Sequence, residues 1–124
     1  GAKQLIHLRR LMESRPFLSR APDQSLILGD PGKGGEHIQA TRGDGYAFVY
    51  LPYGQGVKVR LGKISGDKVK AWWFDPRTGK AESAGTYPNR AAKQFDPPGK
   101  KKRGNDWVLV LDDASKSFAP PGRR

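Results

Sequence analysis

The chain has 124 residues, no cysteine, and a formal net charge of +11 from 23 basic and 12 acidic residues. This length suits one domain, and the lack of cysteine excludes disulfides, thiolate metal sites and cysteine nucleophiles. No apolar run approaches the length of a membrane-spanning helix, and no signal peptide is visible. The charge predicts a surface that attracts polyanions or acidic polymers by long-range electrostatics.

The first predicted element is a helix over residues 3–14. Its apolar positions recur at helical spacing, at Leu5, Leu8, Leu11 and Met12. Pro16 ends the helix because the residue before a proline is pushed out of the α region. We assign residues 1–24 to this helix and a linker, and we expect the apolar stripe to face a domain that precedes this sequence. The absence of an initiator methionine also suggests a fragment of a longer protein.

Short apolar runs separated by turn residues fill the rest of the chain. They predict strands at residues 25–28, 37–42, 45–51, 56–61, 69–74, 82–87, 91–95 and 106–112. The 16 glycines and 10 prolines predict frequent turns between them. We therefore predict an all-β fold, an antiparallel β-sandwich of about seven to eight strands over residues 25–113. One N-terminal helix precedes it, and a polar tail follows at residues 114–124.

The strand at residues 69–74 is the strongest of these predictions. Apolar residues occupy nearly all positions on both of its faces, which is typical of a strand covered on both sides. The next five residues combine Asp75, a proline that fixes φ, and Gly79, which is free to adopt positive φ. This order predicts a tight turn and a hairpin.

Catalytic and metal chemistry find no support in the sequence. His7 and His37 are the only histidines, and neither lies in a zinc-binding spacing. No Gly-x-Ser-x-Gly elbow is present, and most carboxylates fall in turns, where aspartate caps its own backbone. The Arg42-Gly43-Asp44 tripeptide is explained by a turn between two strands. We predict no catalytic residue, no metal and no cofactor.

Aromatic side chains are more numerous than a small core requires. Trp73, Phe48 and Trp107 are predicted to be core residues. The candidate ligand-binding residues are Trp72, Tyr53 and Tyr50, which we expect to be exposed. Exposed aromatic faces stack on sugar rings or prolines, so these three residues suit a polymer ligand.

A basic run is the second candidate binding element. It consists of Lys100, Lys101, Lys102 and Arg103. Such a run is typical of a solvated loop, and it predicts a salt-sensitive, unspecific attraction to acidic polymers. No named nucleic-acid motif accompanies it, so we expect no specific nucleic-acid partner.

Five stretches of the chain together resemble a known family. They are Leu18-Ser-Arg-Ala-Pro-Asp-Gln-Ser25, Ala40-Thr-Arg-Gly-Asp-Gly-Tyr-Ala47, Val49-Tyr-Leu-Pro52, Ala71-Trp-Trp-Phe-Asp-Pro-Arg-Thr-Gly79 and Asp106-Trp-Val-Leu-Val-Leu-Asp-Asp113. Their order and spacing resemble the collagen-binding C-terminal domain of bacterial collagenase-like proteins, which follows an apiosidase-like glycoside hydrolase barrel. The resemblance spans about residues 3–113, and no motif in it names ligand residues.

This resemblance implies a β-sandwich accessory domain of a secreted bacterial hydrolase, in an extracellular or periplasmic location. Its expected partners are the parent catalytic barrel and either collagen or a polysaccharide. Two roles stay open: binding of such a ligand, or a purely structural role in which the sandwich packs on the barrel and stabilises it. An autonomous enzyme is disfavoured because no catalytic constellation is visible.

Overall fold

The computed structural model describes residues 2–123, and these residues form nine strands in two antiparallel sheets with one α-helix. The larger sheet has the order β1 (Ala21–Pro22), β3 (Gln39–Gly43), β4 (Tyr46–Leu51), β9 (Trp107–Asp113), β6 (Lys68–Asp75) and β7 (Lys80–Pro88). The smaller sheet has the order β2 (Ile27–Leu28), β5 (Val57–Arg60) and β8 (Ala92–Phe95). The predicted antiparallel β-sandwich with an N-terminal helix is confirmed.

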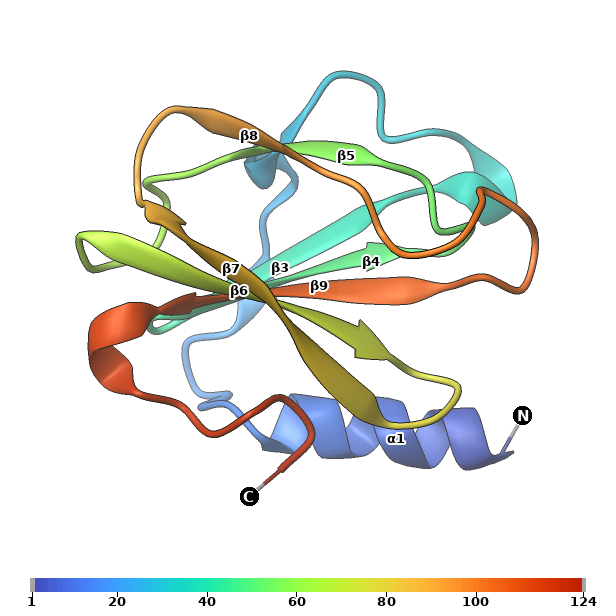
Figure 1. Cartoon of the computed structure of the whole chain (residues 1–124), viewed down its shortest axis with the longest axis horizontal. Helices are drawn as coiled ribbons and strands as arrows, with labels where there is room; N and C mark the ends of the chain where they lie inside the picture. The colour runs from blue at the N-terminus through green and yellow to red at the C-terminus, as the bar shows by residue number, and fades with distance from the viewer. Residues whose placement is uncertain (1, 124) are drawn as a thin grey trace.

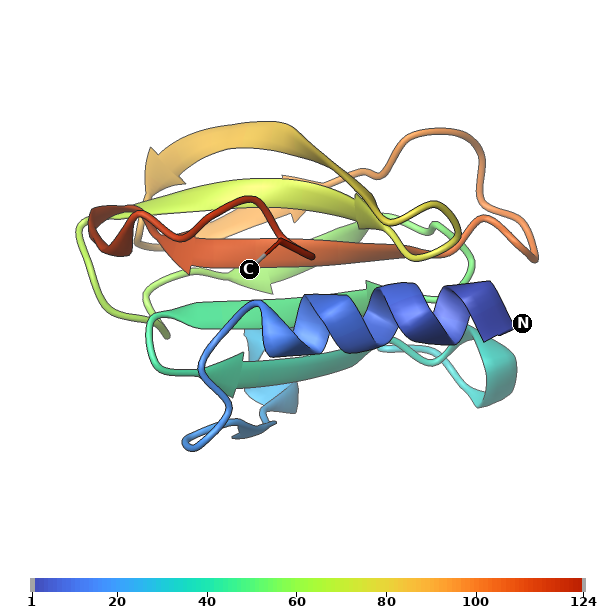
Figure 2. The ribbon, with the colours of Figure 1, turned by 90° about the horizontal axis from the view of Figure 1, so that it is seen from below.

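Helical elements complete the chain. The α-helix is α1 (Ala2–Glu13), and three short 3-10 turns are η1 (Gln24–Leu26), η2 (Gly34–Glu36) and η3 (Ala114–Lys116). The small sheet covers one face of the large sheet, whereas α1 and the C-terminal segment lie along the other face (Figures 1 and 2). The molecule thus has three layers, with the large sheet in the middle.

The three central strands of the large sheet, β4, β6 and β9, carry apolar side chains on both faces. The face toward the small sheet contributes Ala47, Val49, Leu51, Val69, Ala71, Trp73, Trp107, Leu109 and Leu111 to one core cluster. The face toward α1 contributes Tyr46, Phe48, Trp72, Phe74, Val108 and Val110 to a second cluster. Alternation along each strand therefore supplies two cores, as the two-sided apolar pattern of residues 69–74 predicts.

The hairpin after β6 is confirmed. The Asp75 carboxylate accepts a hydrogen bond from the Arg77 backbone N–H at 2.9 Å, and Gly79 closes the turn with φ +76°. A Cβ on Gly79 would lie 2.5 Å from His7 Nδ1 of α1. Glycine is therefore required here twice, for positive φ and for the close approach of the helix.

The apolar stripe of α1 is divided between two environments. Leu11 is buried at 2% exposure, and Leu8 packs beside it on the outer face of the large sheet. Leu5, Ile6 and Met12 remain exposed. Part of the stripe therefore completes the core of this domain, and the rest remains exposed.

Polar contacts attach α1 to β9 at both ends of the helix. Near its start, Gln4 donates a hydrogen bond to the Asp106 carboxylate. Just after its end, Arg15 donates to both oxygens of Asp112, at 3.0 and 2.7 Å. The Arg15 and Asp112 side chains are 0% and 3% exposed. The helix therefore runs along β9 in the same direction. The Gln4–Asp106 contact fixes its start, and the Arg15–Asp112 pair fixes its end.

The C-terminal segment is not a free polar tail, contrary to our expectation. Phe118 packs on the second core cluster, and its ring lies edge-on to Tyr46 at 6.3 Å between centroids. Pro121 is buried, and Arg15 lies 4.7 Å from the centroid of the Phe118 ring. The apolar residues within this polar stretch bring it back over the large sheet. Gly1 and Arg124, the ends of the predicted linker and tail, lie outside the described residues.

We predict that Arg15→Ala lowers the free energy of unfolding by about 3–5 kcal/mol, because Asp112 would remain buried without a partner. Arg9→Ala is the matched control, because the Arg9–Glu13 pair is exposed, with Arg9 81% accessible, and pairs of this kind contribute about 0.5 kcal/mol or less. Urea denaturation of both variants measures the difference. Equal effects of the two substitutions would show that α1 does not depend on this buried pair.

Candidate functional site

Trp72, the first candidate for ligand stacking, is buried at 7% exposure, so the expectation that it is exposed is wrong. Its indole N–H donates to Asp112 at 3.1 Å, and the ring belongs to the core cluster beneath α1. Alternation does place Trp72 on the opposite face from Trp73, as we predicted. That face is covered by the helix, however, and Trp72 offers no surface on which a ligand could stack.

Tyr50 is half-buried and also points into the layer between the sheet and α1. Its hydroxyl donates to the Asp106 carboxylate at 3.3 Å. Burial and the neighbouring Asp106 charge raise the pKa of Tyr50 to about 12. Tyr50 is therefore a neutral member of a part-buried network, and it is only partly exposed because it packs against the core cluster beneath α1.

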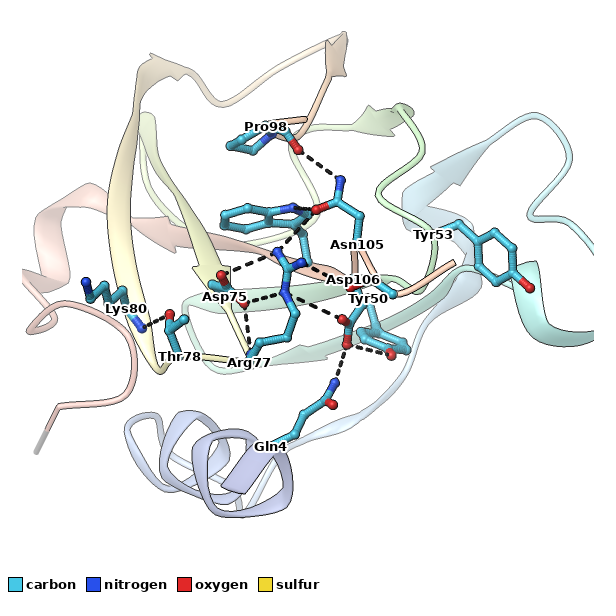
Figure 3. A network of polar contacts seen from close by, with 12 residues as sticks. Gln4, Tyr50, Tyr53, Asp75, Arg77, Thr78, Lys80, Pro98, Asn105 and Asp106 are labelled. Carbon is cyan, nitrogen blue, oxygen red and sulfur yellow. Dashed lines mark hydrogen bonds and ion pairs between the residues drawn. The ribbon is translucent and has the colours of Figure 1, made fainter. Parts of the chain in front are cut away.

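Arg77 and Asp106 are the centre of this network, at the end of the sandwich where the β6–β7 turn meets the start of β9 (Figure 3). Arg77 Nε lies 2.9 Å from Asp75 and 3.9 Å from Asp106. The guanidinium also donates to the Gly104 carbonyl at 3.0 Å. One arginine thus neutralises two carboxylates and holds the hairpin turn against the loop that precedes β9.

Asn105 fixes the loop between β8 and β9. Its buried side-chain N–H2 donates to the carbonyls of Pro98 at 3.1 Å and Lys100 at 3.0 Å. Its side-chain oxygen accepts from the Trp107 indole at 3.1 Å and from Arg77 at 3.2 Å. A single buried amide therefore connects the loop backbone to the core and to the charged network (Figure 3).

The four basic residues of the predicted patch all lie on this loop and are exposed: Lys100, Lys101, Lys102 and Arg103. The backbone N–H of Lys102 donates to the Tyr53 carbonyl at 2.9 Å, which brings the loop beside the connection between β4 and β5. Tyr53 is half-buried, and its ring points away from the Arg77–Asp106 network (Figure 3). Tyr53 and the basic loop are thus the sequence candidates that the fold brings together at the surface.

One group of exposed side chains is apolar, and none of its residues was among the binding residues predicted from the sequence. Leu5, Ile6, Met12, Phe17 and Leu18 are the exposed large hydrophobics of the described residues. All lie on α1 or in the linker directly after it, and Leu18 is 93% exposed. The helical stripe gave part of this signal, but the two positions after Pro16 carry no periodicity that would mark them.

A polar groove of about 740 Å³ lies at the β3–β4 turn. Arg42 at its rim pairs with Asp23 at 2.9 Å, and Asp44 pairs with Lys116 at 3.7 Å. The Arg42-Gly43-Asp44 tripeptide therefore forms a turn, as predicted, and both of its charged side chains are engaged within the domain.

Within residues 2–123, no group of three or more potential ligands is placed to hold a metal ion. No helix in the same range is long and apolar enough to cross a membrane.

These features define a helix-backed antiparallel β-sandwich with a basic loop at one end and an apolar strip on its helix. Residues 21–112 match the family described as "Putative collagen-binding domain of a collagenase", and the chain belongs to this family. Comparison with curated proteins finds no match.

Two solved structures are similar over nearly the whole chain. One, a glycoside hydrolase, has 39% sequence identity and a TM-score of 0.86 over 91% of this chain. The other, a glycoside hydrolase family 5 protein from Bacteroides vulgatus, has 37% identity and a TM-score of 0.88 over 94% of this chain. The chain spans about 25% of each of those chains. It therefore corresponds to a small accessory domain of much larger proteins.

Acid should destabilise the domain through Asp113. Hydrogen bonds from Ser65 and then Ser115 hold the pKa of Asp113 below its ordinary value of 3.8. A lowered folded-state pKa stabilises the protein above about pH 4, and this contribution is lost as pH falls through the folded-state value. We expect Asp113→Asn to be less stable than wild type at pH 6 and to lose less stability between pH 5 and pH 2.

Urea denaturation at a series of pH values measures this effect, with Asp67→Asn as the control that removes an exposed carboxylate. The difference between the wild-type and Asp113→Asn curves isolates Asp113 from the other carboxylates. A difference that stays constant from pH 6 to pH 2 would show that the hydrogen bonds from Ser65 and Ser115 do not favour the charged form.

Proposed function

We propose that this chain is a non-catalytic accessory domain that packs against the catalytic barrel of a larger glycoside hydrolase. The observation that carries this proposal is the position of the exposed large hydrophobics, which all fall between residues 5 and 18 of the described chain. Exposed large hydrophobics gathered on one helix and its linker, here called the apolar strip, are typical of an interface. The strip belongs to the helix and linker, whereas the surfaces of the sheets present polar or charged residues.

The similar solved structures support the same role. The chain covers about a quarter of each glycoside hydrolase, so most of each relative lies outside the matched domain. The match to the Bacteroides protein covers 94% of this chain, so fewer residues are unmatched than the 12 residues of α1. At least part of the helix therefore falls in the matched region, which supports a role for its outer side in contacting the rest of the parent chain.

The absence of a catalytic role agrees with the way the carboxylates are used. Asp75 and Asp106 are paired with Arg77, and Asp112 is paired with Arg15. Carboxylates that act in glycoside hydrolysis need an open site between them. We expect the isolated chain to show no turnover of glycosides or peptides in assays with repurified protein. Activity that is abolished by one Asp or Glu substitution in this chain would overturn the non-catalytic assignment.

Docking through the apolar strip can be tested with Leu5→Gln, Ile6→Gln, Phe17→Ser and Leu18→Ser combined. Exposed positions contribute little to folding, so the isolated chain should keep its melting temperature within a few degrees. In the full-length parent, the same changes should make this domain melt in a transition separate from that of the rest of the protein. They should also make the linker accessible to limited proteolysis. A quadruple substitution of exposed Lys33, Lys58, Arg60 and Lys68 by Ser is the control. A parent that is unaffected by the apolar changes would contradict docking through this strip.

A second candidate function is binding of a polymer, either collagen or a polysaccharide. The specific observation in its favour is the exposed basic loop with Tyr53 beside it. The resemblance to secreted bacterial hydrolases supports an extracellular or periplasmic location, where such polymers are met. The two functions use different surfaces and are compatible within one domain.

A further inference from the structure

We infer that the basic loop and Tyr53 form a binding surface for a polysaccharide that carries carboxylate or sulfate groups. This surface, the basic rim, consists of Lys100, Lys101, Lys102, Arg103 and Tyr53. The inference rests on the second candidate function, polymer binding, and deepens it by naming the ligand class and the residues. It does not depend on docking through α1.

The backbone of the basic loop is held in place by hydrogen bonds, although its four basic side chains are exposed. Buried Asn105 binds two of its carbonyls, and Arg77 binds a third, at Gly104. The Lys102 N–H donates to Tyr53, and the Asn105 N–H donates to the Lys102 carbonyl at 3.2 Å. The backbone that carries the four cations is therefore ordered before any ligand arrives, which lowers the entropic cost of binding.

The positive charges of the rim are available to a ligand. Among the described residues, Lys100, Lys102 and Arg103 make no ion pair within 4.0 Å. Lys101 pairs with Glu36 at 3.4 Å, but both side chains are about half exposed, so this pair is readily exchanged. The nearby carboxylates of Asp75 and Asp106 are already paired with Arg77. The rim therefore has a local excess of positive charge.

Tyr53 lies between two loops. Its carbonyl contacts the basic loop, and its hydroxyl lies 3.5 Å from the position that a Cβ on Gly35 would occupy. Its ring points away from the buried network (Figure 3). A partly exposed aromatic ring beside a loop that carries four cations suits a sugar ring that stacks on tyrosine while its anionic groups meet lysine and arginine.

The same features argue against other polymers. Single-stranded nucleic acids stack successive bases on several aromatic side chains, and the rim has one. Polyproline-type chains such as collagen strands dock in aromatic-lined grooves. Trp72 and Tyr50, which would have widened the aromatic surface, are covered by α1. An anionic polysaccharide needs only spaced cations and a single stacking residue, and the rim supplies both.

The test compares two triple variants of the same net charge. Lys100→Ala, Lys102→Ala and Arg103→Ala remove free charges of the rim, whereas Lys58→Ala, Lys68→Ala and Lys80→Ala remove exposed charges elsewhere. Tyr53→Ala and Tyr53→Phe test stacking, and melting curves verify that each variant folds. The probes are heparin for sulfate, polygalacturonate for carboxylate, neutral dextran, fibrillar collagen, and single-stranded DNA as a polyanion that is not a polysaccharide.

We expect wild type to bind heparin, polygalacturonate or both, and to leave dextran unbound. At about 0.15 M salt, the rim triple variant should weaken this binding at least about tenfold and the control triple variant less than about threefold. Tyr53→Ala should weaken the fraction that persists at higher salt, and Tyr53→Phe should retain it. Preference for one of the two probes identifies the anionic group.

Equal losses in the two triple variants would overturn the inference, because net charge alone would then explain binding. Binding of DNA as tight as that of the polysaccharides, with no effect of Tyr53→Ala, would overturn it in favour of a general polyanion surface. If the chain binds collagen or dextran and the rim variant does not change this binding, polymer binding is supported but the basic rim is refuted as its site. If the wild-type chain binds none of the probes, both polymer binding and this binding site are refuted, and the docking role remains.

Discussion

The buried ion pair between Arg15 and Asp112 is the interaction on which the architecture of this domain depends. Asp112 lies on the outer face of the central strand β9, where burial raises its pKa and the Arg15 guanidinium opposes that shift. A carboxylate in this position is tolerated only with a partner. The partner is Arg15, two residues after the last residue of α1, so the helix must lie along β9. Phe118 then covers the guanidinium from the other side.

This arrangement determines which surfaces remain for function. Once α1 covers the outer face of the large sheet, Trp72 and Tyr50 become part of a second core. The small sheet covers the inner face, and neither sheet is left with an open aromatic surface. What remains is the outer side of α1 with its linker and the loop end of the sandwich (Figure 1). One of these surfaces is apolar and the other is strongly basic, so they suit partners of different chemistry.

Much of the fold could be predicted from the sequence because local patterns specified it. The two-sided apolar run at residues 69–74, the turn at Asp75 and Gly79, and the run before Asp112 all gave the strands observed. The candidate site was harder to predict. Alternation places Trp72 and Trp73 on opposite faces, but it does not say what covers each face. That information lies in a contact between Arg15 and Asp112, which are 97 positions apart.

The basic loop illustrates the reverse case, in which composition was visible but its physical meaning was not. Four consecutive cations between glycines are typical of a flexible, solvated loop. The residue that changes this interpretation is Asn105, whose side chain joins the loop backbone, the Trp107 indole and the Arg77 guanidinium. Because Trp107 is part of the core between the sheets, the position of the cations is coupled to the packing of the sandwich itself. The charges of the loop thus have a defined arrangement, which a flexible run of the same composition would lack.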